Sequence, residues 1–136
     1  MKVVLSKEKV IDYINKYYND VLGIKGCAAF HFEETYYGYG KVEQKILVPK
    51  ITYFGSTKIL DQENNVTIEI FDLDIKNILD HFLAEEGYIS YNFNIDKGSF
   101  REVKDSFPVG RTRSINRPYF NGVEFEVTTY SNVKRY

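Results

Sequence analysis

The stretch Gly110–Phe125, GRTRSINRPYFNGVEF, decides the fold that the sequence predicts. Its Asn121-Gly122 pair stands between two strand-like runs, which is the pattern of a tight β-hairpin. A two-residue type I′ turn needs residues that tolerate positive φ, and Asn followed by Gly meets that need. The sequence therefore predicts a hairpin that turns at Asn121-Gly122.

Side chains alternate along a strand, so the predicted hairpin has two faces. The apolar face, which we expect to join the core, holds Phe120, Val123, Phe125 and Val127. The other face holds Arg111, Arg113, Arg117 and Tyr119. With this turn Arg117 lies opposite Glu126, and a weak surface ion pair can account for it. Arg113 faces Tyr130 and no carboxylate, which makes it the better candidate for binding a ligand.

Arginine is concentrated in this part of the chain. The protein has 13 Lys and 5 Arg, and four of the five arginines lie between Arg101 and Arg117. A guanidinium group presents a planar fork of donors that suits phosphate or carboxylate, which an ammonium group matches less well. The cluster predicts recognition of an anion.

The bulk composition limits the class of protein. A chain of 136 residues fits a single domain, here residues 1–136. Its net charge of -1 argues against a generic nucleic-acid binder. One cysteine, Cys27, excludes an internal disulfide and suggests a reducing compartment. No signal peptide or membrane-spanning run is visible. We expect a protein of the cytoplasm, with no membrane partner and no nucleic-acid partner.

Hydrophobic periodicity predicts an α+β fold, a mainly antiparallel sheet with two helices. Residues 6–22 are expected to form a helix with Ser6 as its N-cap, and a second helix, capped by Asp72 or Asp74, ends at Glu86 before Gly87. Strands are expected over residues 26–37, 41–54, 57–60, 65–71, 88–95 and 99–104, with turns at 38–40, 61–65 and 96–98 and a loop at 105–110. Pro49 predicts that its strand is an edge or is broken there. Residues 131–136 are expected to fray.

Motifs for catalysis are absent from the sequence. His31 and His81 have no Cys or His at ligand spacing, which argues against a zinc site. Neither a phosphate-binding loop nor a nucleophile elbow nor an HExxH helix is present. The acidic pairs Glu33-Glu34 and Glu85-Glu86 are sequence neighbours, whose side chains point apart. We therefore expect no catalytic residues, no metal and no cofactor, and a protein that is not an enzyme.

Three residue types after position 80 together suit a nucleotide-like ligand. Arg111 and Arg113 offer forks for phosphates, Asn92 offers an amide, and Phe82 offers a ring. Each has an ordinary alternative. Phe82 matches the core stripe of the second helix, and Asn92, with Ser90 and Asn94, suits an exposed strand face as well as a ligand contact.

With these residues the chain resembles the Thoeris anti-defence proteins of the first type, phage-encoded sponges for a cyclic ADP-ribose signal. The resemblance implies that Phe82 stacks on adenine, Asn92 makes a polar contact and Arg113 contacts the pyrophosphate. It further implies a homodimer or higher oligomer, a ligand near a subunit interface that is held without cleavage, and an arginine from another protomer, for which we take Arg111. Some members of the family resemble traps for cyclic di- or trinucleotides at a second site.

The expected function is therefore sequestration of a cyclic ADP-ribose isomer in the host bacterial cytoplasm, which would block Thoeris immunity. The expected ligand-binding residues are Phe82, Asn92, Arg111, Arg113 and Arg117. Three alternatives stay open. The protein could inhibit another bacterial defence enzyme by protein–protein contact, it could bind a cyclic oligonucleotide, or it could be an enzyme that degrades such a nucleotide.

Overall fold

The computed structural model describes the backbone of residues 1–37, 44–106 and 111–129, and the side chains of residues 1–34, 48–96 and 120–129. The elements in chain order are β1 (Lys2–Ser6), α1 (Lys7–Lys16), η1 (Tyr17–Val21), β2 (Lys25–Tyr37), β3 (Gln44–Ile59), β4 (Gln62–Ile70), α2 (Asp72–Glu85), β5 (Tyr88–Ser106) and β6 (Arg111–Thr129). They form two three-stranded antiparallel sheets, ordered β1-β6-β5 and β2-β3-β4. The predicted α+β class is confirmed.

The predicted first helix is confirmed. Ser6 caps it, because the Ser6 Oγ accepts a hydrogen bond from the Lys9 backbone N–H at 3.3 Å. Its apolar positions bury Val10, Ile14 and Tyr18, and the last turn widens into the π-helix η1, where Leu22 N donates to Tyr17 O. The structure adds β1 before the helix, a strand that the sequence analysis did not predict.

The second sheet differs from the prediction in one respect. Residues 57–60 are not a separate strand, because β3 continues to Ile59 and pairs with β4 as far as Gln62. The chain reverses at Leu60 and Asp61, both at positive φ. Pro49 pairs with Phe32 of β2, ahead of Ile51, where pairing with β4 begins. Strand β3 is therefore an edge strand at Pro49, as predicted, and becomes the central strand of its sheet from Ile51 on.

The predicted hairpin turn at Asn121-Gly122 is wrong. Strand β6 runs through both residues, and Asn121 is one extra residue in the ladder, because Phe120 aligns with Lys97 and Gly122 with Asp96. Gly122 also pairs with Ser6 of β1, has φ of 155°, and leaves no room for a Cβ, which would lie 2.4 Å from Leu5 O. The glycine serves a β-bulge and the close approach of β1 rather than a turn.

The predicted turn at residues 96–98 is also wrong, since β5 continues to Ser106 with a register shift at Asp96 and Lys97. Strand β5 ends at Ser106 and β6 begins at Arg111, and residues 107–110 of the predicted loop lie outside the described residues. The predicted turn at 38–40 and the frayed tail at 131–136 lie outside them too. Arg117 aligns with Phe100 rather than with Glu126, and Arg113 aligns with Lys104.

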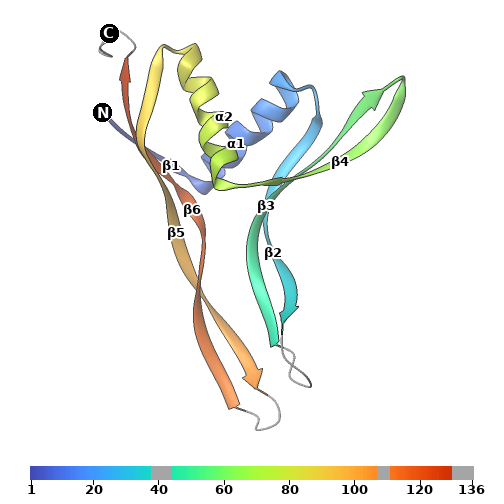
Figure 1. The fold of residues 1–136 in the computed structure, drawn as a ribbon, viewed down its shortest axis with the longest axis vertical. Helices are drawn as coiled ribbons and strands as arrows, with labels where there is room; N and C mark the ends of the chain where they lie inside the picture. Colours follow the sequence, from blue (N-terminus) through green and yellow to red (C-terminus); the bar gives the residue numbers. More distant parts are fainter. Residues whose placement is uncertain (38–43, 107–110, 130–136) are drawn as a thin grey trace.

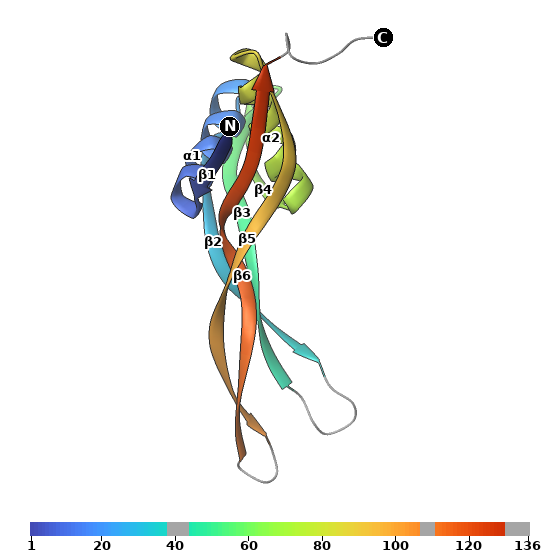
Figure 2. The same cartoon turned by 90° about the vertical axis from the view of Figure 1, so that its left-hand side faces the viewer.

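The core lies between the helices and the two sheets. The predicted core face of β6 is confirmed, because Phe120, Val123, Phe125 and Val127 are buried together with Ile75, Ile78 and Leu79 of α2. In Figure 1 both helices stand at one end of the molecule, and the β2–β3 and β5–β6 hairpins extend from that end to the opposite one. Figure 2 shows the two hairpins running the same way in the second view.

Within the described residues, no helix is long and apolar enough to cross a lipid bilayer.

Candidate functional site

A groove of about 540 Å3 lies between the start of α2 and the middle of β5. Its lining combines a ring, an amide, a cation, a carboxylate and two aliphatic side chains: Asp72, Leu73, Lys76, Phe93, Asn94 and Ile95. Pockets for small molecules in proteins are commonly of this size, with apolar walls and a few polar groups. The groove is therefore the candidate functional site.

The start of α2 is fixed locally. Asp74 Oδ2 accepts a hydrogen bond from the Phe71 backbone N–H at 2.8 Å, and both Asp72 and Asp74 stand in the first turn, where the helix dipole favours negative charge. The helix starts at Asp72, so Phe71 rather than an aspartate is the N-cap residue. Phe71 and Leu73 remain 59% and 67% exposed. Two large apolar side chains therefore face solvent beside the groove.

Asp80 ties the helix to the strand behind the groove. Its Oδ2 lies 2.6 Å from the Lys76 ammonium, one turn earlier on α2, and its Oδ1 accepts a hydrogen bond from the Ser90 hydroxyl of β5. Asp80 is half-buried, so these donors replace water around the carboxylate. Side-chain hydrogen bonds therefore hold α2 and β5, the two sides of the groove, at a fixed separation.

A bulge in β5 changes the predicted division of its faces. Tyr91 aligns with Glu126 and Asn94 with Glu124, so Asn92 and Phe93 together span the place of one residue, and Asn92 has φ of 52°. Ser90 consequently reaches α2 on the core side, while Tyr91 is 43% exposed. The predicted grouping of Ser90 with Asn92 and Asn94 on one face is wrong.

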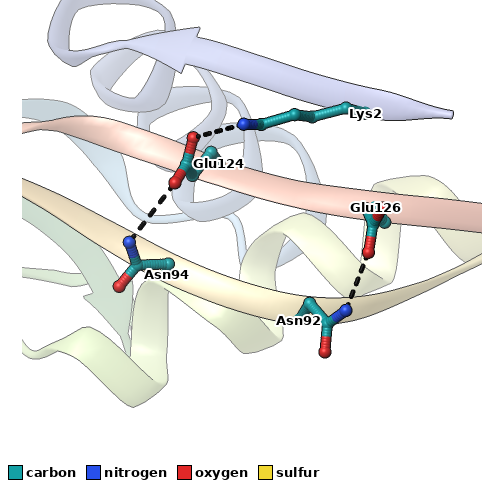
Figure 3. A network of polar contacts seen from close by, with 5 residues as sticks. All are labelled: Lys2, Asn92, Asn94, Glu124 and Glu126. Carbon is teal, nitrogen blue, oxygen red and sulfur yellow. Dashed lines mark hydrogen bonds and ion pairs between the residues drawn. The ribbon is translucent and has the colours of Figure 1, made fainter.

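Asn92 belongs to a polar network on the sheet face that the helices do not cover (Figure 3). Its Nδ2 donates to Glu126 Oε2 at 2.7 Å, and Asn94 Nδ2 donates to Glu124 Oε1 at 3.4 Å. Lys2 of β1 lies 3.1 Å from Glu124. The hydrogen bond from Lys2, and then that from Asn94, lowers the pKa of the Glu124 carboxyl below its ordinary value.

Phe82 lies on the other side of that sheet, between the two helices. Its ring centroid is 5.4 Å from that of Tyr13, 5.3 Å from that of His81 and 6.4 Å from that of Tyr17. The Lys16 ammonium lies 5.2 Å from the ring centroid. Phe82 is half-buried against the core, as its spacing also allowed. The structure does not bring Phe82 and Asn92 together.

The arginines lie farther along β6. Their side chains lie outside the described residues, but the register aligns Arg111 with Ser106, Arg113 with Lys104 and Arg117 with Phe100. Nine residues separate Ile95 in the groove from Lys104, which at about 3.3 Å per residue is roughly 30 Å. One copy of the chain therefore does not place Phe82, Asn92 and Arg113 around a single small ligand, and their role in binding stays a prediction.

Sequence reasoning missed the groove residues Lys76, Phe93 and Leu73. Leu73 carried a usable signal, since it falls off the helical stripe of Ile75, Ile78, Leu79 and Phe82 and so marks an apolar residue outside the core. Phe93 carried only the signal of an apolar strand position, which does not distinguish a groove from the core against which it packs. Among the described residues, no group of three His, Cys, Asp or Glu side chains could hold a metal ion.

Comparisons with known proteins give no relative: no family model, no curated protein and no solved structure matches the chain.

Proposed function

We propose that the protein is a non-catalytic binding protein that sequesters a cyclic ADP-ribose isomer, with the groove between α2 and β5 as its binding site. The observation that carries this proposal is that Phe93, Asn94, Lys76 and Asp72 line one groove of about 540 Å3, which is largely open to solvent. A ring, an amide, a cation and a carboxylate are the groups that a nucleotide needs, and the volume is in the range of small-molecule pockets.

Each groove residue has a chemical counterpart in such a ligand. Phe93 packs on Phe125 and the core, and the rest of its ring offers an apolar surface for a base. The Asn94 amide donates to Glu124 on the other sheet face, so it reaches a base edge in the groove only by turning away from that carboxylate. A carboxylate such as that of Asp72 accepts hydrogen bonds from ribose hydroxyls, and the Lys76 ammonium suits a phosphate as a point charge. These four residues take the roles that the sequence analysis assigned to Phe82, Asn92 and Arg113.

Sequestration also requires that the ligand leaves unchanged. A protein that withholds a signal from its receptor, as proposed here for Thoeris immunity, works by slow release, which is set mainly by the dissociation rate. Lys76 already pairs with Asp80, so a bound phosphate competes with that carboxylate for the ammonium. Asp80 keeps the Ser90 hydroxyl as a second donor when Lys76 turns to the ligand.

The test measures binding of cyclic ADP-ribose isomers by calorimetry, with mass spectrometry of the molecule released after heat denaturation. We expect intact ligand, and a Kd about 2- to 12-fold weaker in Asn94→Ala, which removes a neutral hydrogen bond worth about 0.5–1.5 kcal/mol. Lys76→Ala removes a charged one worth about 1.5–3 kcal/mol, so we expect a Kd weaker by about tenfold or more. Asn64→Ala and Lys58→Ala, on the exposed β3–β4 hairpin, are the matched controls. Unchanged affinity in both groove variants would reject the site, and turnover of the ligand would show an enzyme instead.

A protein partner is the second candidate, and the exposure of Phe71 and Leu73 favours it. Large apolar side chains that protrude beside a groove are typical of protein-binding surfaces. A partner that co-purifies with the wild type and is lost in Leu73→Asp, with no nucleotide released on denaturation, would support this function over sequestration.

A further inference from the structure

The charge of the chain is divided unequally along the molecule. Residues 97–119 carry six Lys or Arg and two Asp or Glu, a net charge of +4. The remaining residues carry a net charge of -5. The overall net charge of -1 is therefore the sum of a basic segment and an acidic remainder, and a near-neutral total does not exclude nucleic-acid binding by this segment.

The described part of the basic segment is a two-stranded antiparallel ribbon, made of residues 97–106 of β5 and 111–119 of β6. It extends away from the helical end of the molecule (Figure 1). The pairing of β1 with β6 covers Gly122–Glu126 and stops short of the ribbon, and no third strand in the described part of the chain pairs with it. A hairpin of two strands is only marginally stable in water, so a ribbon of this length gains stability from a partner.

The register gathers most of the positive charge on one face of the ribbon, here called the arginine face. Alternate residues of β6 and their partners on β5 share this face: Arg111 with Ser106, Arg113 with Lys104, Ile115 with Glu102, Arg117 with Phe100, and Tyr119 with Gly98. It therefore holds four cations, one carboxylate and two aromatic residues. The charged residues of the other face are Arg101, Lys97 and Asp105.

The length of the arginine face selects the kind of anion. Arg111 and Arg117 are six residues apart along β6, or about 20 Å at about 3.4 Å per residue. That span exceeds one small nucleotide, but it matches a chain of several phosphates. Cations in line with aromatic residues are the combination that binds single-stranded nucleic acid, in which bases stack on rings while cations follow the backbone.

We propose that the arginine face of the β5–β6 ribbon binds single-stranded nucleic acid. Lys104, Arg111, Arg113 and Arg117 supply charge for the sugar–phosphate backbone, and Phe100 and Tyr119 supply rings for the bases. The face begins at Gly98 and Tyr119, three residues or about 10 Å along β5 from Ile95 of the groove, and reaches Lys104 at roughly 30 Å. It shares no residue with the groove, and the proposal does not depend on the function proposed there.

The test uses the full chain and a fluorescent oligo-dT of about 20 nucleotides, with anisotropy measured from about 50 to about 200 mM salt. Each phosphate contact on a single strand contributes about -0.7 to the slope of log K against log salt, so four contacts predict a slope of about -2.8. Arg113→Gln is expected to reduce the slope by about 0.7, and the triple change at Arg111, Arg113 and Arg117 to leave about -0.7. Arg101→Gln, on the other face, is the matched control and is expected to leave the slope unchanged.

Tyr119→Leu separates recognition of bases from general attraction of anions. We expect it to weaken oligo-dT binding about 5- to 150-fold, the effect of losing one stacked base, with the salt slope preserved. The proposal would be overturned if heparin bound as tightly as oligo-dT, or if a duplex of the same length bound more tightly. It would also be overturned if Arg101→Gln lowered the salt slope as much as Arg113→Gln does. Circular dichroism verifies that each variant is folded. Asn94→Ala in the groove is expected to keep full oligo-dT affinity. The test of the ribbon is therefore independent of the test of ligand binding in the groove.

Discussion

The Asn15 side chain on α1 takes the place of a neighbouring strand at the edge of β2, because its Oδ1 accepts a hydrogen bond from the Ala28 backbone N–H at 2.6 Å. Asn19 acts in the same way one turn later, where its Nδ2 donates to Gly26 O at 3.0 Å and its Oδ1 accepts from Gly26 N at 3.1 Å. A sheet edge with open backbone groups is costly when buried and prone to wrong pairing. Two helical amides close this stretch of it.

Asn15→Ala is expected to lower the free energy of unfolding by about 1–3 kcal/mol, because the part-buried Ala28 N–H loses its acceptor. Urea denaturation measures the change. Asn64→Ala is the control, since its amide donates only to Gln62 O on an exposed hairpin, and a change within about 0.5 kcal/mol is expected there. Equal effects in the two variants would show that the amide does not support the β2 edge.

Gly122→Ala is expected to destabilise the protein by more than Gly23→Ala. Both glycines have positive φ, 155° and 69°, but a Cβ at Gly122 would meet Leu5 O at 2.4 Å, whereas nothing lies within 4 Å of one at Gly23. We expect about 1 kcal/mol at Gly23 for backbone strain alone, and at least about 3 kcal/mol at Gly122, where β1 must also shift. Thermal denaturation of the two variants side by side measures the difference, and similar losses would mean that β1 moves at little cost.

The same glycine shows how much of the fold the sequence predicts. Periodicity located both helices and the buried face of β6, and the Ser6 cap located the start of α1, because those signals depend on neighbouring residues. The Asn121-Gly122 pair was misread because a hairpin turn and a β-bulge demand the same backbone freedom. Which one forms depends on pairing with β1 and β5, and those partners are distant in the sequence.

Lys2→Ala is expected to raise the pKa of Glu124 towards its ordinary value, since the hydrogen bond from Lys2 is the main cause of the lowered pKa. A carboxyl whose pKa is lowered on folding stabilises the fold above its unfolded pKa, and that contribution is lost as pH falls through the lowered pKa. NMR titration of the Glu124 side-chain carboxyl measures the midpoint. Lys9→Ala, a lysine on α1, is expected to leave the midpoint in place, and a wild-type midpoint in Lys2→Ala would assign the shift to Asn94 instead.

The candidate site was less predictable than the fold, and the reason is the bulge at Asn92. Strict alternation placed Ser90 with Asn92, whereas the extra residue turns Ser90 towards α2 and brings Phe93 to the groove. Phe93, Asn94 and Lys76 line the groove, although the Asn94 amide donates to Glu124 on the sheet face away from the helices. Side-chain placement follows the actual register rather than the spacing in sequence.

Ser90→Ala is expected to loosen the wall of the groove. The Ser90 hydroxyl is the donor from β5 to Asp80, so its loss leaves the half-buried carboxylate with Lys76 alone and removes a hydrogen bond between strand and helix. We expect a loss of about 1.5–3 kcal/mol in the free energy of unfolding, as is usual for a hydrogen bond to a charged group. Hydrogen exchange of α2 amides should rise in this variant, while that of α1 amides stays the same. Ser56→Ala on β3 is the matched control, and the same exchange in both variants would show that packing, rather than this bond, holds α2 against β5.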